Sequence, residues 1–217
     1  MDKSAEISHS KLNFNKKRII DRFVIFLARG FSNYFWIIVD ILSSKNQRIS
    51  NYYETLIGKE YANECKSFNL SKGKKILHIG CGSYPLTEIT IAKLFDVNIV
   101  GIDKNLKAVK RANEVILQKR LKNKIKIEQG NGSNFPVKKF DMIIVSSCAV
   151  PKKDILNHIL KTAKQECFII VRDLDIETDE ILTCIKNQKN ITIVKRIHHP
   201  VPSIFPIGWE AFHLIKK

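Results

Sequence analysis

Apolar positions from residue 74 onward form short runs that alternate with segments of helical spacing. Short apolar runs bounded by turn residues are typical of buried strands, and apolar residues three or four apart are typical of helices. The sequence predicts strands at 75–80, 97–102, 124–129, 140–146, 166–172, 190–197 and 208–215, and helices at 85–95, 105–121, 151–164 and 177–187. This alternation indicates an α/β fold with a mainly parallel sheet covered on both faces.

Residues 1–70 show a different pattern, with helical spacing and no strand alternation. Apolar residues between 19 and 38 predict helices on either side of a break at Gly30, and a further helix is expected at 51–68. We therefore predict a helical N-terminal cap at 1–70 and a second domain at 71–217. The cap is expected over the carboxyl ends of the strands, where ligands bind in such sheets.

A glycine turn between the first predicted strand and helix is the strongest functional signal. Gly80 and Gly82 allow the backbone to approach a ligand where a Cβ would collide. Asp103 ends the next strand, where a carboxylate accepts hydrogen bonds from ribose hydroxyls. Glycine turns also occur for structural reasons alone, but this spacing favours a nucleoside site.

Pro85 stands where a dinucleotide-binding fingerprint has its third glycine, so the loop is poorly suited to binding a pyrophosphate. The loop better fits S-adenosylmethionine (SAM), which carries no phosphate. Asn131 follows the third strand and offers a donor and an acceptor to adenine, although an ordinary turn explains it equally well. The candidate cofactor-binding residues are Gly80, Cys81, Gly82, Pro85, Thr87, Asp103, Asn131, Ser146 and Ala149. With a closing antiparallel pair of strands, we expect the Rossmann-like seven-stranded fold of class I SAM-dependent transferases.

Composition limits the classes of partner. The net charge is +16, and nine of the basic residues lie between 104 and 126. That strip favours a solvated helix face over nucleic-acid binding, because it contains no aromatic residue for base stacking. The segment 19–42 carries four charges, so no transmembrane helix is expected, while its aromatic cluster leaves weak membrane-surface contact open.

Cysteine and histidine usage gives no sign of a disulfide or metal framework. The five cysteines form no C-x-x-C pair, and the N-terminus lacks a secretory signal, so a cytoplasmic location is expected. His198 and His199 have no third ligand at a suitable spacing, and no metal site is predicted. His78, two residues before the first glycine, is expected to be a core histidine.

Several segments together resemble the nicotianamine synthase family. The run 79–87, IGCGSYPLT, is similar to that family's Gly-x-Gly-x-x-Pro-Leu-Thr segment, and 51–61, NYYETLIGKEY, is similar to its upstream Asn-Tyr helix. The AVPK run at 149–152, Arg172 and the pair His199-Pro200 also match family positions. The resemblance covers about residues 50 to 217.

The resemblance implies that the aminobutanoyl (3-amino-3-carboxypropyl) group of SAM, rather than its methyl group, is transferred to a small amine or amino acid. Methylthioadenosine would leave, and the product would be a metal-chelating compound like an opine or nicotianamine. The family also has an acidic base in its helical domain, for which this chain offers Asp21 and Asp40.

An attacking amine must be neutral, so a carboxylate or tyrosine should take up its proton. The catalytic candidates are Glu60, Tyr53 and Tyr52, since Tyr53 and Glu60 lie seven residues apart on one predicted helix face. Arg172 or Lys152 is expected to pair with a substrate carboxylate, although both also fit surface positions.

Two alternatives stay open at this stage. The first is a SAM-dependent methyltransferase acting on a small molecule or RNA. The second is a non-catalytic SAM-fold protein that binds a partner or membrane. The acceptor and the oligomeric state are not specified by the sequence.

Overall fold

The computed structural model describes residues 26–27, 30–66, 68, 70–174, 178–199 and 208–217 of the 217-residue chain. The chain divides into two compact units, residues 1–36 and 37–217, and the second contains the sheet. Within the described residues, no helix has the length and apolar character needed to cross a membrane.

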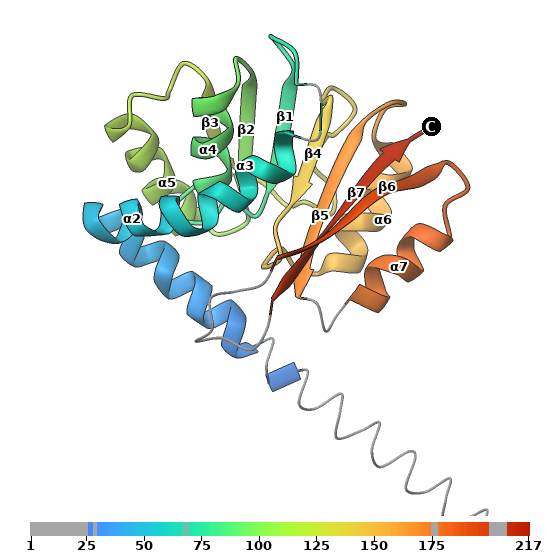
Figure 1. The fold of residues 1–217 in the computed structure, drawn as a ribbon, viewed down its shortest axis with the longest axis horizontal. Helices are drawn as coiled ribbons and strands as arrows, with labels where there is room; N and C mark the ends of the chain where they lie inside the picture. Colours follow the sequence, from blue (N-terminus) through green and yellow to red (C-terminus); the bar gives the residue numbers. More distant parts are fainter. Residues whose placement is uncertain (1–25, 28–29, 67, 69, 175–177, 200–207) are drawn as a thin grey trace, which may run out of the picture. The chain divides into compact units, whose positions relative to one another are not determined.

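A seven-stranded sheet forms the centre of the second unit (Figure 1). Its order is β3-β2-β1-β4-β5-β7-β6; β7 is antiparallel to β5 and β6, and the other neighbouring strands are parallel. The strands are β1 (Lys75–Ile79), β2 (Asn98–Asp103), β3 (Ile125–Gln129), β4 (Met142–Val145), β5 (Phe168–Leu174), β6 (Ile191–His199) and β7 (Trp209–Lys216). The predicted fold class, including the closing antiparallel pair, is confirmed.

Helices cover both faces of this sheet. They are α4 (Leu86–Leu94), α5 (Leu106–Gln118), α6 (Lys152–Thr162) and α7 (Thr178–Lys186). One face packs against α6 and α7 through a continuous apolar core that includes Leu77, Ile79, Ile143, Val145, Ile169, Val171, Leu156, Ile159 and Ile181. Because side chains alternate along a strand, the intervening residues face the opposite layer, where His78 lies 2.9 Å from Glu88 of α4.

The central strands are buried on both faces, and this explains their uninterrupted apolar sequences. All four residues of β4 are buried, whereas the edge strand β6 is mostly exposed and carries Lys195 and Arg196. Charged side chains on an edge strand disfavour pairing with another sheet. The strand β4 is shorter than predicted, because a turn in which the Phe140 N–H donates to the Val137 carbonyl precedes it.

The helix predicted at 51–68 begins earlier and has three parts. These are α2 (Gln47–Tyr53), the π-helical segment η1 (Glu54–Gly58) and α3 (Lys59–Lys66). Asn46 starts α2, since its side chain accepts the backbone N–H groups of Arg48 and Ile49. The helix that precedes α2 covers 30–45, and Gly30 is itself helical where the sequence predicts a break, a conformation that costs about 1 kcal/mol relative to Ala.

Candidate cofactor and transfer site

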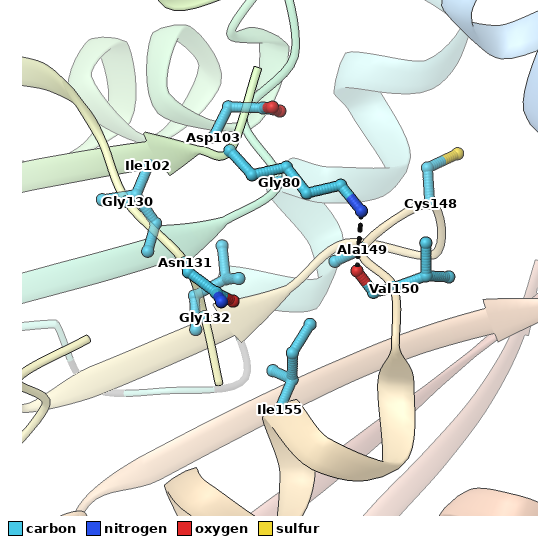
Figure 2. Close-up of a pocket in the computed structure, with 12 residues that line it drawn as sticks. Gly80, Ile102, Asp103, Gly130, Asn131, Gly132, Cys148, Ala149, Val150 and Ile155 are labelled. Atoms are coloured by element: carbon cyan, nitrogen blue, oxygen red, sulfur yellow. Dashed lines mark hydrogen bonds between the residues drawn. The ribbon is translucent and has the colours of Figure 1, made fainter. Parts of the chain in front are cut away.

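A cleft opens at the carboxyl ends of β1, β2 and β4, with an empty volume of about 350 Å³ (Figure 2). Residues from four loops line it: Ile79, Gly80, Ile102, Asp103, Lys104, Gly130, Asn131, Gly132, Cys148, Ala149, Val150 and Ile155. This edge is where parallel α/β sheets bind ligands, because the connecting loops diverge there. The cleft is therefore the candidate cofactor site.

The glycine loop has the backbone shape that the sequence indicates. Gly80 and Gly82 have φ of +87° and +68°, a region that side-chain-bearing residues rarely adopt. A Cβ at Gly80 would lie 3.0 Å from the Cβ of Ala149, across the cleft. The Gly82 N–H donates to Asp103 Oδ2 at 3.0 Å, so the loop and the carboxylate of β2 are held together.

Four of the nine predicted cofactor residues line the cleft: Gly80, Asp103, Asn131 and Ala149. The others lie in or behind its walls. Gly82 supports Asp103, the buried Cys81 directs its Sγ toward the carbonyl of Gly82, and Pro85 precedes α4. The Thr87 hydroxyl accepts a hydrogen bond from Arg172 at 2.8 Å, and the Ser146 carbonyl accepts one from Lys152 at 2.5 Å.

Replacing Asp103 with Ala is expected to weaken SAM binding by about 1–3 kcal/mol, roughly 5- to 150-fold in Kd. The change removes the ribose acceptors and the partner of the Gly82 N–H. Calorimetric titration with SAM measures the effect. The control is Asp96→Ala, a carboxylate whose side chain is 59% exposed and pairs with Lys72 at the surface. Equal affinities of the two variants would contradict this position for the ribose.

Asp40 lies against the glycine loop, although it is 43 residues away in the chain. Its carboxylate accepts the backbone N–H of Ser83 in a very short contact, and a Cβ at Gly82 would collide with it. Burial raises the pKa of Asp40 to about 7, and the nearby carboxylates of Asp103 and Glu88 act in the same direction. A carboxylate of this kind takes up and releases protons near neutral pH.

The three tyrosines of the NYYETLIGKEY segment have separate environments. Tyr53 and Tyr61 are partly buried and are electrostatic neighbours, whereas Tyr52 is 67% exposed. Burial raises the pKa of Tyr61 to about 12 and that of Tyr53 well above its usual value, so both remain protonated. The structure therefore does not bring Tyr52 to the site.

The π-helical segment explains this arrangement. A π-helical turn is wider than an α-helical turn, so the residue that aligns with Tyr53 shifts from Glu60 toward Tyr61. Glu54 begins this segment and accepts hydrogen bonds from the Tyr84 hydroxyl, Lys93 and Lys119. Although burial opposes it, these donors lower the pKa of Glu54 to about 2. Glu54 thereby fixes the helix over the glycine loop.

Arg172 is buried in an ion-pair cluster. Its Nε donates to Glu64 of α3 at 2.8 Å, its Nη1 donates to Thr87 at 2.8 Å, and its guanidinium lies 3.7 Å from the ring centre of Tyr61. His199 contacts Glu60 through Nδ1 at 2.9 Å and Glu64 through Nε2 at 3.1 Å. The two carboxylates raise the pKa of His199 despite its burial, so they favour the protonated form of its ring.

Lys152 is also enclosed, with 1% of its surface exposed. Its ammonium donates to the backbone carbonyls of Ser146, Ser147 and Arg172 at 2.5, 3.1 and 2.9 Å, and lies 3.8 Å from Asp173. These bonds join the loops that follow β4 and β5. The position of Lys152 thus shapes the cleft wall from behind.

Sequence reasoning missed part of the site. Gly130 and Gly132 flank Asn131 at the cleft, and Cβ atoms at these two positions would collide with Phe135 and Ile79. Glycine is therefore required at both positions, and the Gly-Asn-Gly run in the sequence is the signal that indicates it. Cys148 also lines the cleft, and burial raises the pKa of its thiol. Nothing in the local pattern around Cys148 points to this position.

The fold and the glycine loop are those of the class I SAM-dependent methyltransferase fold. Residues 70–205 match the family described as a methyltransferase domain, so the chain belongs to that family. An uncharacterized protein of Haemophilus influenzae (strain ATCC 51907 / DSM 11121 / KW20 / Rd) is 24% identical over 148 residues. The match covers 65% of this chain and 57% of that relative's length.

Solved structures with a similar fold include a mutant of the nicotianamine synthase MtNAS in complex with SAM. It has a TM-score of 0.68 and 16% identity, and the similarity covers 88% of this chain and 76% of that one. MtNAS in complex with MTA and tNA has a TM-score of 0.68 and 15% identity over 88% and 75% of the two chains. At this level of identity, the fold is the feature that this chain shares with the two MtNAS structures.

The methyltransferase-domain match supports SAM as the cofactor, and the cleft lies at the edge of the sheet where α/β folds bind their ligands. Gly80 lies so close to Ala149 that a Cβ at Gly80 would be crowded, and the Asp103 carboxylate one strand away binds the same loop. Asn131 lines the cleft beyond β3, and Gly80 of the glycine loop lines it beyond β1.

Proposed function

We propose that the protein transfers the aminobutanoyl group of SAM to a small amine or amino acid, giving a metal-chelating product like an opine or nicotianamine. The observation that carries this proposal is the Asp40 carboxylate, with a pKa of about 7, bonded to the Ser83 amide in the loop that holds the methionine end. Amine transfer needs a proton acceptor at this end of the cofactor. The structural similarity to MtNAS with bound MTA and tNA supports the same choice.

Asp40 takes the role of proton acceptor in preference to the candidates from the helix. Glu60 binds His199 at 2.9 Å, and Tyr53 is kept protonated by its raised pKa. A protonated tyrosine acts as a hydrogen-bond donor and orients the amine. Its ring centre is 6.2 Å from that of Tyr84, which continues the glycine loop.

Bound SAM supplies an electrophilic carbon next to its sulfonium: the amine nitrogen forms a bond to that carbon, the carbon–sulfur bond breaks, and its electron pair stays on sulfur in methylthioadenosine. Asp40 receives the proton that the amine nitrogen loses. The glycine loop and Asp103 hold the nucleoside against the cleft.

Identification of the nucleoside product tests the proposal. The purified protein is incubated with SAM and a mixture of amines and amino acids, and the nucleosides are separated by chromatography. Methylthioadenosine above the level of a protein-free control is the expected product. S-adenosylhomocysteine as the nucleoside product would contradict aminobutanoyl transfer and support methyl transfer, which the methyltransferase-domain match favours.

A further inference from the structure

We infer that the acceptor is an aliphatic di- or polyamine without a carboxylate, rather than an amino acid. This inference rests on the proposed function and identifies the substrate class of the same site. It follows from the charges around the methionine end of the cleft. An amino-acid acceptor needs a cation for its carboxylate, whereas a polyamine needs carboxylates and aromatic faces.

The buried cations near this site already have partners. Arg172 binds Glu64 and Thr87 at 2.8 Å each, and its guanidinium also covers the ring of Tyr61. Lys152 donates to three backbone carbonyls, and His199 lies between Glu60 and Glu64. Releasing Arg172 or His199 toward a substrate would leave a buried carboxylate without its counter-charge, which is costly.

Lys104 is the basic residue that lines the cleft itself. It follows Asp103 at the ribose end, and its Nζ donates to the carbonyl of Val150 at 3.1 Å.

Asp40, unlike these cations, has no oppositely charged partner among the residues that the structure describes. Among the residues that the structure describes, no Lys, Arg or His forms an ion pair with it, and its hydrogen bonds come from the backbone. Its neighbours Asp103 and Glu88 are also acidic, and together with burial they keep its pKa high. An ammonium group placed beside Asp40 would relieve this repulsion, because opposite charge favours the ionised carboxylate.

An aromatic side chain near Asp40 also favours a polyamine. Tyr53 is an electrostatic neighbour of Asp40, and aromatic faces attract ammonium groups. Glu60 is 36% exposed at its side chain and uses one oxygen for His199, which leaves its second oxygen for a distal ammonium. We expect the carboxylates of Asp40 and Glu60 and the ring of Tyr53 to bind a chain of amines.

Binding to the loaded protein tests this inference apart from turnover. Wild-type protein saturated with sinefungin, a non-reactive SAM analogue, is titrated by calorimetry with spermidine and, separately, with glutamate and histidine. Spermidine is expected to bind at least about 10-fold more tightly than either amino acid. Asp40→Asn should weaken spermidine binding by about 10- to 100-fold, and the surface variant Asp96→Asn should bind as wild type does.

The outcomes separate this inference from the proposed function. Tighter binding of glutamate or histidine than of spermidine, or no binding of any of them, would overturn the polyamine assignment even if methylthioadenosine is formed. Spermidine binding accompanied by S-adenosylhomocysteine production would support the polyamine assignment and contradict aminobutanoyl transfer. If Asp40→Asn fails to fold, the discrimination by wild-type protein still decides between the classes.

Discussion

Replacing Asp40 with Asn is expected to lower the rate of aminobutanoyl transfer by about 10²- to 10⁴-fold, the usual contribution of a general base. Asn has nearly the same shape and still accepts the Ser83 N–H, so the glycine loop should keep its conformation. SAM affinity should therefore be retained. Steady-state formation of methylthioadenosine and calorimetric titration with SAM measure the two quantities separately.

The pH profile gives an independent readout of the same group. Because burial raises the pKa of Asp40 to about 7, the carboxyl is protonated below that pH and acts as a base above it. The value of kcat/KM, which reports on the free enzyme, should rise with pH through about 7 in wild-type protein. This rise should disappear in the residual activity of Asp40→Asn.

Asp96→Asn serves as the matched control, since Asp96 is exposed and pairs with Lys72 at the surface. It should keep wild-type turnover and pH dependence. Wild-type turnover in Asp40→Asn with an unchanged profile would remove Asp40 from the mechanism. The assignment of the proton acceptor would then be wrong.

Arg172→Met is expected to destabilise the folded protein by about 3–5 kcal/mol, the cost of leaving one partner of a buried ion pair alone. Arg172 is 1% exposed, and its loss leaves Glu64, which is fully buried, without its strongest cationic partner. Urea unfolding followed by circular dichroism measures the change. Removing both charges in Arg172→Met/Glu64→Leu should restore part of the loss, because no unpaired charge then remains.

Arg196→Met is the control for this experiment. Arg196 pairs with Glu210 at the edge of the sheet, where its side chain is 46% exposed, so its loss should cost less than about 1 kcal/mol. Similar costs for the two variants would contradict a structural role for Arg172. A higher KM with unchanged stability in Arg172→Met would instead favour the substrate contact predicted from the sequence.

The sequence predicts the strands and the glycine loop because their signals are local. Apolar runs such as β4 identify buried strands, and the spacing from Gly82 to Asp103 reflects one strand-helix-strand unit. The contacts that define the transfer site are long-range. Asp40 meets Ser83 across 43 residues and Arg172 meets Glu64 across 108, and no local pattern specifies such pairs.

The π-helical segment is the clearest case of a hidden local feature. The run 51–61 has a helical pattern, and in a regular α-helix Tyr53 and Glu60 would lie on the same face. The wider turn at Glu54–Gly58 changes this alignment, and packing against α4 and the hydrogen bond to Tyr84 stabilise it. Such a segment depends on tertiary contacts, and propensity alone does not indicate it.

The fate of labelled SAM tests the central claim most directly. Two samples of SAM, one with radiocarbon in the carboxyl group and one with radiocarbon in the methyl group, are incubated with the protein and spermidine. Transfer of the carboxyl label to the amine, with the methyl label retained in methylthioadenosine, is the predicted result. Transfer of the methyl label to the amine, with the carboxyl label left in S-adenosylhomocysteine, would contradict the account.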